Sequence, residues 1–345
     1  MRTRKNPSKI AGVLMLALSV GEGNGAEVPK TMQAAAIDRA GGPEVLTLHT
    51  LPVPVPAADE VLIAVHTAGV GVWDAGIREH PSEISHSHFP LVLGTDGSGL
   101  IAAVGAQVRG FRVGEQVYAY SWDNPQGGFY AEYLAVPAKL VGHVPPGLSL
   151  RDAGAIGTTA LTAIQGIDDA LHVKSGETLV IHGAAGGVGS LALQLAKVRG
   201  ARVLATATGE DGLSFVKQLG ADAAIDGRQG DIVAAARALA PGGVDAVLAL
   251  AGGDALERCL DALQPRGRLA FPSGVRPEPK ARGTITIVRY DAIAGPAEYQ
   301  RLNQAITAAK LQVPIAAEFP LAEAARAHER MQSGHVLGKI VLRVR

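Results

Sequence analysis

The chain has 345 residues, of which 47% are apolar and 19% charged, and its formal net charge is zero. These values are typical of a globular protein with a large core, and the length favours two domains. The neutral balance gives no general attraction to nucleic acid or to a membrane surface. Cys259 is the single cysteine, which excludes an internal disulfide and a cysteine-rich zinc site. We expect it to be packed near a helix.

Residues 1–31 differ from the rest of the chain. A basic start, MRTRKNPSK, precedes the apolar run IAGVLMLALSV and then a small, polar segment. This order is typical of a signal peptide, and the run is too short to span a bilayer. A second interpretation treats 1–31 as an extension before a true start at Met32, where a strand-like pattern begins.

The remaining chain divides into three segments. In 32–150, glycine and proline separate short strand-like stretches such as EVLIAVHTAGV. In 151–295, apolar strands alternate with helical stretches, which predicts a parallel, doubly wound sheet. The segment 296–345 follows the pattern helix, helix, strand. We therefore predict an α/β protein with a β-rich first domain and a second domain built on a parallel sheet.

A glycine-rich turn, IHGAAGGVGS, joins a predicted strand to a predicted helix. Its spacing, G-x-x-G-x-x-G, in that context is typical of dinucleotide binding. Glycine lets the backbone approach a pyrophosphate, and the free N–H groups at the helix N-terminus stabilise the negative charge. The predicted contacts are Gly183, Ala185, Gly186, Gly187, Val188 and Gly189.

The end of the next strand bears on the choice of dinucleotide. NAD sites usually carry an Asp or Glu there to hold the ribose hydroxyls, but this strand ends ATATG. We expect NADP(H), with its 2′-phosphate held by Thr208, Gly209 and Arg228. The alternative is NAD, with Glu210 or Asp211 on the ribose.

Two later strand ends are also predicted to contact the cofactor, because ligands of open α/β sheets bind at the carboxyl ends of strands. The first follows VDAVLAL and the second follows GRLA. The predicted residues are Ala251, Gly252, Gly253, Phe271, Pro272, Ser273 and Gly274.

The sequence resembles the medium-chain dehydrogenase/reductase superfamily, and more closely its zinc-free quinone oxidoreductase-like branch, which is similar to the NADP-dependent alcohol dehydrogenases. The matching pieces include HTAGVGVWDAGIRE, FPLVLGTDGSG, GGFYAEYLAVP, GTTALTAI, HGAAGGVGSLALQLAK and HVLGKIVLRV. The resemblance covers the chain from Met32 onward. It implies a GroES-like catalytic domain over 32–150, a Rossmann domain over 151–295 and a return to the first domain over 296–345. It also implies a homodimer.

Zinc members of the superfamily have ligands where this chain has other residues. By the resemblance, Gly71 replaces a cysteine and Gly94-Thr95-Asp96 replaces a Gly-His-Glu motif. A catalytic zinc needs three protein ligands, so we expect no metal. The polar segment with His80, His86 and His88 is expected to be a solvated loop.

Without a metal, hydrogen bonds alone must stabilise negative charge on a substrate oxygen, which is easier for a conjugated substrate. The candidate catalytic residues are Tyr130 and Thr158, with Asp74 and Arg78 also considered. For Asp74 we favour a structural ion pair with Arg78 behind the cleft. By the resemblance, Thr158 or Thr159 contacts the nicotinamide. Trp73 and Trp122 are expected to wall a pocket or to pack in the core.

The sequence thus predicts a zinc-independent, NADPH-dependent oxidoreductase that reduces quinones or α,β-unsaturated carbonyl compounds. One alternative is an aldehyde or alcohol oxidoreductase of the same superfamily, and another is a non-catalytic NADP(H)-binding protein. We expect a small-molecule substrate and no nucleic acid or membrane partner. Because soluble NADPH is a cytosolic reagent, we expect a cytoplasmic protein, with export by a signal peptide as the alternative.

Overall fold

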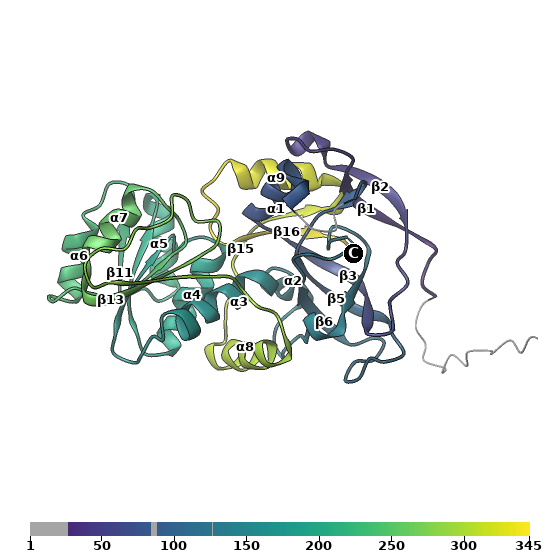
Figure 1. The fold of residues 1–345 in the computed structure, drawn as a ribbon. Helices are drawn as coiled ribbons and strands as arrows, with labels where there is room; N and C mark the ends of the chain where they lie inside the picture. Colours follow the sequence, from purple (N-terminus) through teal and green to yellow (C-terminus); the bar gives the residue numbers. More distant parts are fainter. Residues whose placement is uncertain (1–26, 84–87, 126) are drawn as a thin grey trace, which may run out of the picture.

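A computed structural model describes residues 27–83, 88–125 and 127–345. Most of the predicted leader, residues 1–26, lies outside this range, and so does His86 of the histidine-containing segment. The described chain forms two lobes that lie side by side, as Figure 1 shows. None of the helices in these ranges has the length and hydrophobicity needed to cross a bilayer.

The first lobe is built on two sheets that are antiparallel except for one parallel pair, β15 with β16. The larger sheet has the order β15-β16-β3-β5-β6-β8, with β7 also paired to β3, and the smaller has the order β2-β1-β4. Short helices α1, α2 and α9 pack around them. The bounds are β1 Thr31–Ile37, β2 Thr47–Pro52, β3 Glu60–Val70, α1 Val72–Glu79, β4 Leu91–Val92, β5 Asp96–Val104, β6 Gln116–Tyr120, β7 Tyr133–Pro137, β8 Val141–His143, α2 Leu150–Ala153, β15 Ile315–Pro320, α9 Ala324–Gln332 and β16 Lys339–Arg343.

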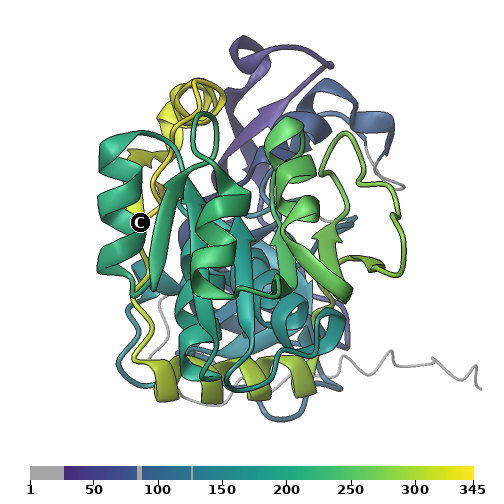
Figure 2. The ribbon, with the colours of Figure 1, turned by 90° about the vertical axis from the view of Figure 1, so that its left-hand side faces the viewer.

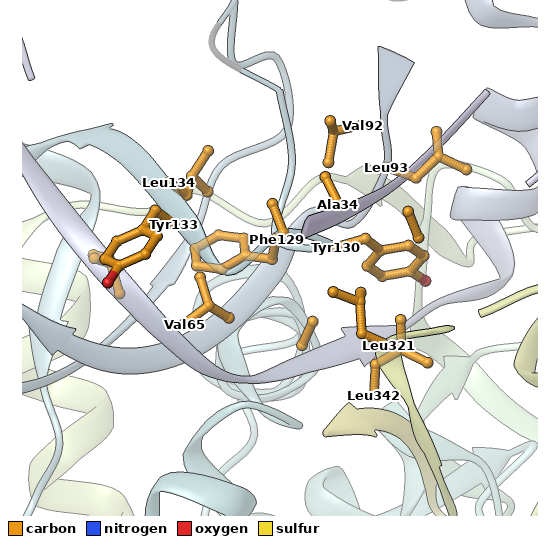
Figure 3. Close-up of a cluster of buried hydrophobic side chains, with 14 of the residues drawn as sticks. Ala34, Val65, Val92, Leu93, Phe129, Tyr130, Tyr133, Leu134, Leu321 and Leu342 are labelled. Carbon is orange, nitrogen blue, oxygen red and sulfur yellow. The ribbon is translucent and has the colours of Figure 1, made fainter. Parts of the chain in front are cut away.

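The core of the first lobe lies between its sheets and α9. β3 and β7 are buried along most of their length, so both faces of these strands are covered. Figure 3 shows the aromatic side chains Phe129 and Tyr130 packed among aliphatic residues of both sheets, with Leu321 and Leu342 from the C-terminal segment. The C-terminal segment therefore completes the core of the first lobe.

The second lobe contains a parallel sheet with the order β11-β10-β9-β12-β13-β14. Numbered within this sheet, the order is 3-2-1-4-5-6, which is that of a dinucleotide-binding Rossmann fold. The predicted α/β class and doubly wound sheet are confirmed. The bounds are α3 Gly157–Gln165, β9 Thr178–His182, α4 Gly187–Val198, β10 Arg202–Ala207, α5 Gly209–Gln218, β11 Ala223–Asp226, α6 Ile232–Leu239, β12 Val244–Ala249, α7 Asp254–Asp261, β13 Leu263–Pro272, β14 Thr286–Tyr290 and α8 Pro296–Ala309.

Helices cover both faces of the parallel sheet (Figure 2). Apolar residues of α3, α4 and α8 pack on one face, and those of α6 and α7 pack on the other. Cys259 of α7 is buried among the apolar residues that α6 and α7 pack against the sheet, and burial raises the pKa of its thiol to about 12. A thiol with that pKa stays protonated near neutral pH, as expected for a packed residue rather than a nucleophile.

Two segments connect the lobes. Every residue of α3 is buried, and the helix leads from the first lobe into the second. The last strand, β16, pairs antiparallel with β3 of the first lobe. Just before β16, the Gly338 N–H donates to the carbonyl of Ala185 in the glycine turn. The turn is therefore held directly by the C-terminal segment.

Candidate functional site

The glycine turn lies between β9 and α4, as predicted. Gly183 has φ +83°, a left-handed conformation that favours glycine. A Cβ on Gly189 would collide with the Gly183 carbonyl and lie 2.6 Å from Ala184 Cα. A Cβ on Gly186 would meet only the Gly183 carbonyl, at 3.6 Å. Gly189 therefore permits close helix–strand packing, whereas Gly186 leaves open space for a ligand.

The start of α4 is suited to bind a phosphate. Gly186 precedes the helix in an extended conformation, and no side chain caps its first turn. The N–H groups of a first helical turn lack partners inside the helix and attract anions. The turn itself is fixed by Thr206, whose hydroxyl accepts a 3.1 Å hydrogen bond from the Gly183 N–H and contacts His182 Nδ1 at 2.8 Å. These residues fit the pyrophosphate of a dinucleotide.

At the tip of β10, the residues lie where we expected them, but one of the proposed phosphate donors is already hydrogen-bonded. Thr208 and Gly209 do follow β10, and Arg228 is exposed nearby, after β11. However, the Gly209 N–H donates to Asp226 Oδ2 at 3.0 Å. Asp226 also accepts from the Arg228 N–H, and these backbone donors lower the pKa of its carboxyl group. Sequence reasoning missed this carboxylate because it reaches the tip from the end of the neighbouring strand.

A second residue that sequence reasoning missed also lies at the tip of β10. His335, from the loop before β16, lies within van der Waals distance of a Cβ placed on Gly209. Its Nε2 contacts Asp211 Oδ2 at 2.7 Å. Its position could not be inferred from the sequence, because 124 residues separate the two partners.

The two later strand ends meet each other. A Cβ on Gly252 would collide with the Arg276 carbonyl, so the loops after β12 and β13 are in close contact. Ala251 is exposed and Phe271 is buried. Ser273 donates to Asp291 Oδ2 at 2.8 Å and accepts from Arg289. Gly274 has φ +102° and no atom within 4 Å of a Cβ position, so space beside it is open.

The positions where zinc relatives have ligands hold an aromatic side chain instead. A Cβ on Gly71 would collide with the indole of Trp73, which therefore fills the space of a residue-71 side chain. The Trp73 Nε1–H donates to Thr95 Oγ1 at 2.6 Å. Within residues 27–83, 88–125 and 127–345, no group of three His, Cys, Asp or Glu side chains is placed to hold a metal ion. The residues present at these positions do not fit a zinc ion.

Next to Trp73 lies a buried charged pair. The Lys339 ammonium is 3.8 Å from Asp96 Oδ1 and 4.7 Å from the centre of the Trp73 ring. Asp96 is fully buried, and its Oδ2 accepts a 3.0 Å hydrogen bond from the Thr158 N–H at the start of α3. Lys339 Nζ, Asp96 Oδ1 and Thr158 Oγ1 are buried atoms that have no hydrogen-bond partner in the described chain.

The other predicted catalytic residues form a separate buried network. Tyr130 donates to Asp74 Oδ2 at 3.2 Å, and its oxygen lies 3.1 Å from His328 Nε2. Arg78 donates to His328 Nδ1 at 2.8 Å. His328 Nδ1 is thus an acceptor, so Nε2 carries the proton and donates to Tyr130. Asp74 and Arg78 are linked through Tyr130 and His328, and this differs from the direct ion pair that we expected.

Burial sets the protonation states of this network. Desolvation raises the pKa of Asp74 to about 7, and a hydrogen bond from the Gly71 N–H opposes that increase. Burial and the nearby Arg78 charge lower the pKa of His328 to about 3, so its ring is neutral at neutral pH. Burial also raises the pKa of Tyr130 well above its usual range. Tyr130 has no exposed atoms, so its position is that of a residue that supports the fold rather than one that contacts a substrate.

The described chain has a small cavity beside Trp122 and a larger groove away from the predicted site residues. A small cavity of about 30 Å³ is lined by residues that include Thr95, Ser121 and Trp122, and Trp122 is 45% exposed. It is large enough for a water molecule. A groove of about 930 Å³ lies elsewhere, between β8 and α8, with Tyr299 and Asn303 on its wall. None of the predicted site residues lines that groove.

The fold and the two-lobed arrangement around the glycine turn define a two-domain dehydrogenase or reductase. Residues 57–146 match the family described as "Alcohol dehydrogenase GroES-like domain", and residues 219–342 match the family described as "Zinc-binding dehydrogenase". The pig protein "Quinone oxidoreductase" is 32% identical, with 91% of this chain and 98% of the pig protein covered. "2-haloacrylate reductase" from a Burkholderia species is 30% identical over 90% of this chain and 98% of that protein.

Solved structures agree with these relatives. "NAD-dependent alcohol dehydrogenase" is 31% identical with a TM-score of 0.84, covering 91% of this chain and all of that one. The Escherichia coli quinone oxidoreductase complexed with NADPH is 26% identical with a TM-score of 0.81, covering 90% of this chain and all of that one. The chain belongs to the medium-chain dehydrogenase/reductase superfamily, as a quinone oxidoreductase-like member.

Proposed function

We propose that this protein is a zinc-independent, NADPH-dependent oxidoreductase that reduces quinones or α,β-unsaturated carbonyl compounds. When bound, NADPH supplies a hydride, which carries two electrons to the acceptor, and a proton from water completes the reduction. The chain's own residues bind the cofactor, orient it and exclude water. The names of the pig and Burkholderia relatives support both acceptor classes.

The observation that carries zinc independence is the position of the Trp73 indole. It fills the space beside Gly71 and is held by Thr95, so two of the ligand positions of zinc relatives contribute to a tryptophan site. Without a Lewis acid, the acceptor must spread its negative charge through a conjugated system. Quinones and enones do this, whereas a simple aldehyde does not.

For the cofactor, we propose that the backbone of Gly183–Gly189 binds the pyrophosphate and that Thr158 contacts the nicotinamide. The loops after β12 and β13 lie at the same edge of the sheet and complete the site. Because Asp226 already occupies the Gly209 N–H, the 2′-phosphate requires side chains, and we propose Thr208 and Arg228. The solved complex of the E. coli protein with NADPH supports NADP(H).

Cofactor choice is tested by titrating NADPH and NADH against the purified protein. We expect NADPH to bind at least about tenfold more tightly, a difference of about 1.4 kcal/mol. Arg228→Ala should remove most of this preference by weakening NADPH alone. The matched control is Arg237→Ala, an exposed arginine on α6. Tighter binding of NADH would instead assign an NAD enzyme, with the ribose held by a carboxylate.

Activity is tested by following NADPH oxidation with quinones, enones and simple aldehydes as acceptors. We expect turnover with the two conjugated classes, unchanged after prolonged treatment with a strong chelator. Turnover confined to aldehydes would favour an alcohol dehydrogenase, as the name of one structural neighbour suggests. No turnover with any class, despite tight NADPH binding, would favour a non-catalytic binding protein.

We also propose a homodimer in the cytoplasm. The assembly is checked by sedimentation of the purified protein, and a monomer at micromolar concentration would contradict the proposal.

N-terminal sequencing of the native protein tests whether residues 1–31 are removed. The domain boundaries at 150 and 295 remain predictions, which limited proteolysis would test.

A further inference from the structure

The buried Lys339–Asp96 pair has no assigned role in the fold or in the proposed reaction. Burying an ammonium and a carboxylate is costly unless hydrogen bonds compensate. Here the two groups are 3.8 Å apart, and neither Lys339 Nζ nor Asp96 Oδ1 has a hydrogen-bond partner in the described chain. Only about 6% of the Lys339 side chain and none of the Asp96 side chain is exposed. A pair with this geometry is poorly explained by stability alone.

The pair lies between the glycine turn, where we propose that the cofactor binds, and the start of α3, which carries Thr158. On one side, the Lys339 stem passes the glycine turn, with Cδ 3.4 Å from a Cβ placed on Gly187. The residue before it, Gly338, is hydrogen-bonded to Ala185 of the same turn. On the other side, Asp96 accepts from the Thr158 N–H. Lys339 and Asp96 thus connect the turn to the first residues of α3.

The charge on Asp96 strengthens this connection. A carboxylate at a helix N-terminus interacts favourably with the helix dipole, and an N–H bond to a carboxylate is about twice as strong as a neutral one. The Lys339 cation lies 3.8 Å from that carboxylate, and both side chains are buried. Thr158 Oγ1, which is buried and has no partner in the described residues, is thereby held at a fixed place at the start of α3. The next residue, Thr159, lies beside the turn, with Cγ2 3.5 Å from a Cβ placed on Gly187.

We propose that Lys339 and Asp96 form a positioning pair that fixes Thr158 relative to the glycine turn, so that the nicotinamide is held in the geometry for hydride transfer. This inference rests on the proposed function. The pair touches neither the cofactor nor the substrate, and it transfers no proton. It acts by placing Thr158, and a misplacement of about 1 Å in a reacting geometry can cost about a hundredfold in rate.

Three variants separate positioning from stability: Lys339→Met, Asp96→Asn and the double variant. Each single variant leaves one buried polar or charged group without its partner, and we expect it to lose stability. The double variant removes both charges, and we expect its stability to return to about that of the wild type. Its kcat with NADPH and a quinone should nevertheless remain about tenfold or more below the wild type, with the NADPH Kd unchanged within about twofold.

Two further measurements report on positioning. The deuterium isotope effect with NADPH labelled at the transferred hydrogen should increase in the double variant, because hydride transfer becomes slower. Hydrogen exchange at the Thr158 amide should become faster, because its acceptor is weaker. Lys339→Arg, which keeps the charge, should retain most of the kcat. The matched control is Lys197→Met with Asp222→Asn, a surface Lys–Asp pair 2.5 Å apart on the second lobe, which should leave kcat unchanged.

The outcomes are distinct. If kcat returns together with stability in the double variant, the pair is only structural and the proposal is wrong. If the NADPH Kd rises more than kcat falls, Lys339 binds the cofactor itself and the proposal is also wrong. If the wild type reduces no acceptor, the proposed function fails, but exchange at the Thr158 amide still decides whether the pair positions that residue.

Discussion

The two lobes bury polar groups in different ways. In the second lobe, the buried polar side chains on the sheet and α4 are Thr178, His182, Ser190 and Thr206. None of them is charged at neutral pH, since burial lowers the pKa of His182 to about 4. The first lobe and β16 bury Asp74, Arg78, Asp96 and Lys339. The polar side chains buried in the second lobe's sheet and α4 are thus uncharged, whereas the first lobe buries an arginine, a lysine and two aspartates.

We relate this difference to the groups that each lobe has to hold in place. The second lobe presents backbone N–H groups at α4 and needs glycine rather than charge to do so. The first lobe must fix side chains that come from α1, β5, α9 and β16, and charged hydrogen bonds give such groups a defined geometry. A buried charge costs stability when it loses its partner, so substitutions should affect the two lobes unequally.

The largest effect is expected for Arg78→Met. The Arg78 side chain is fully buried and donates to His328, to the Gly41 carbonyl and to Glu79. Removing it leaves buried acceptors without a donor, which should lower the free energy of unfolding by about 3 kcal/mol or more. Denaturant unfolding measures this change, with the exposed Arg326→Met as the control. Equal losses in both variants would remove the contrast between buried and surface charge.

The next effect is a pH dependence, tested with Asp74→Asn. The folded pKa of Asp74, about 7, lies above the value of 3.8 expected in the unfolded chain. As pH rises from about 4 to 7, the unfolded chain loses this proton while the folded protein keeps it, so the wild type loses stability. Asp74→Asn should therefore gain stability relative to the wild type over that range, by a few kcal/mol, and no more above it.

Unfolding curves of both proteins from pH 5 to 8 check this prediction. His328 is present in both proteins, so its contribution to the pH dependence of stability cancels in the difference between them. A stability difference that does not vary with pH would show that Asp74 is not held protonated, and the network would then carry a full charge.

A third effect is expected in the second lobe, for Gly189→Ala. The new methyl group would collide with Gly183 and Ala184, and overpacking of this kind costs about 1–3 kcal/mol. The turn must shift, so NADPH binding should weaken by about tenfold or more. Gly242→Ala is the control, because no atom lies within 4 Å of its Cβ position. Unchanged NADPH affinity in Gly189→Ala would mean that the turn does not bind the cofactor.

The smallest effect is expected for Arg301→Met, which breaks a surface ion pair with Asp169 at 2.6 Å. Both side chains are at least 36% exposed, and water and salt screen the attraction. We expect a change of about 0.5 kcal/mol or less in the free energy of unfolding. A larger loss would show that surface charge on the second lobe matters as much as buried charge on the first.

The fold could be predicted because its signals are local. The glycine turn, the apolar strand β9 and the alternation of strands and helices are each visible within about twenty residues. The candidate site was less accessible. His328 and Lys339 join Tyr130, Arg78 and Asp96 from the far end of the chain, and no spacing rule connects residues 198 or 250 positions apart.

Some local signals were present but ambiguous. Lys339 begins the strand KIVLR and is followed by three buried apolar residues, and a cation at the start of a buried stretch indicates a buried partner. Asp74 and Arg78 are four residues apart on α1, which is typical of a direct ion pair. The structure instead places Tyr130 and His328 between them, because both residues face the same buried side of the helix.

The Trp73 indole also constrains the order in which this protein could change. A cysteine introduced at position 71 would collide with the ring, so that substitution alone would disturb the fold without creating a ligand site. Trp73 would first have to be replaced by a smaller residue, which by itself offers no ligand. Creating a metal site here therefore requires at least two substitutions, and the first of them removes the indole without supplying a ligand.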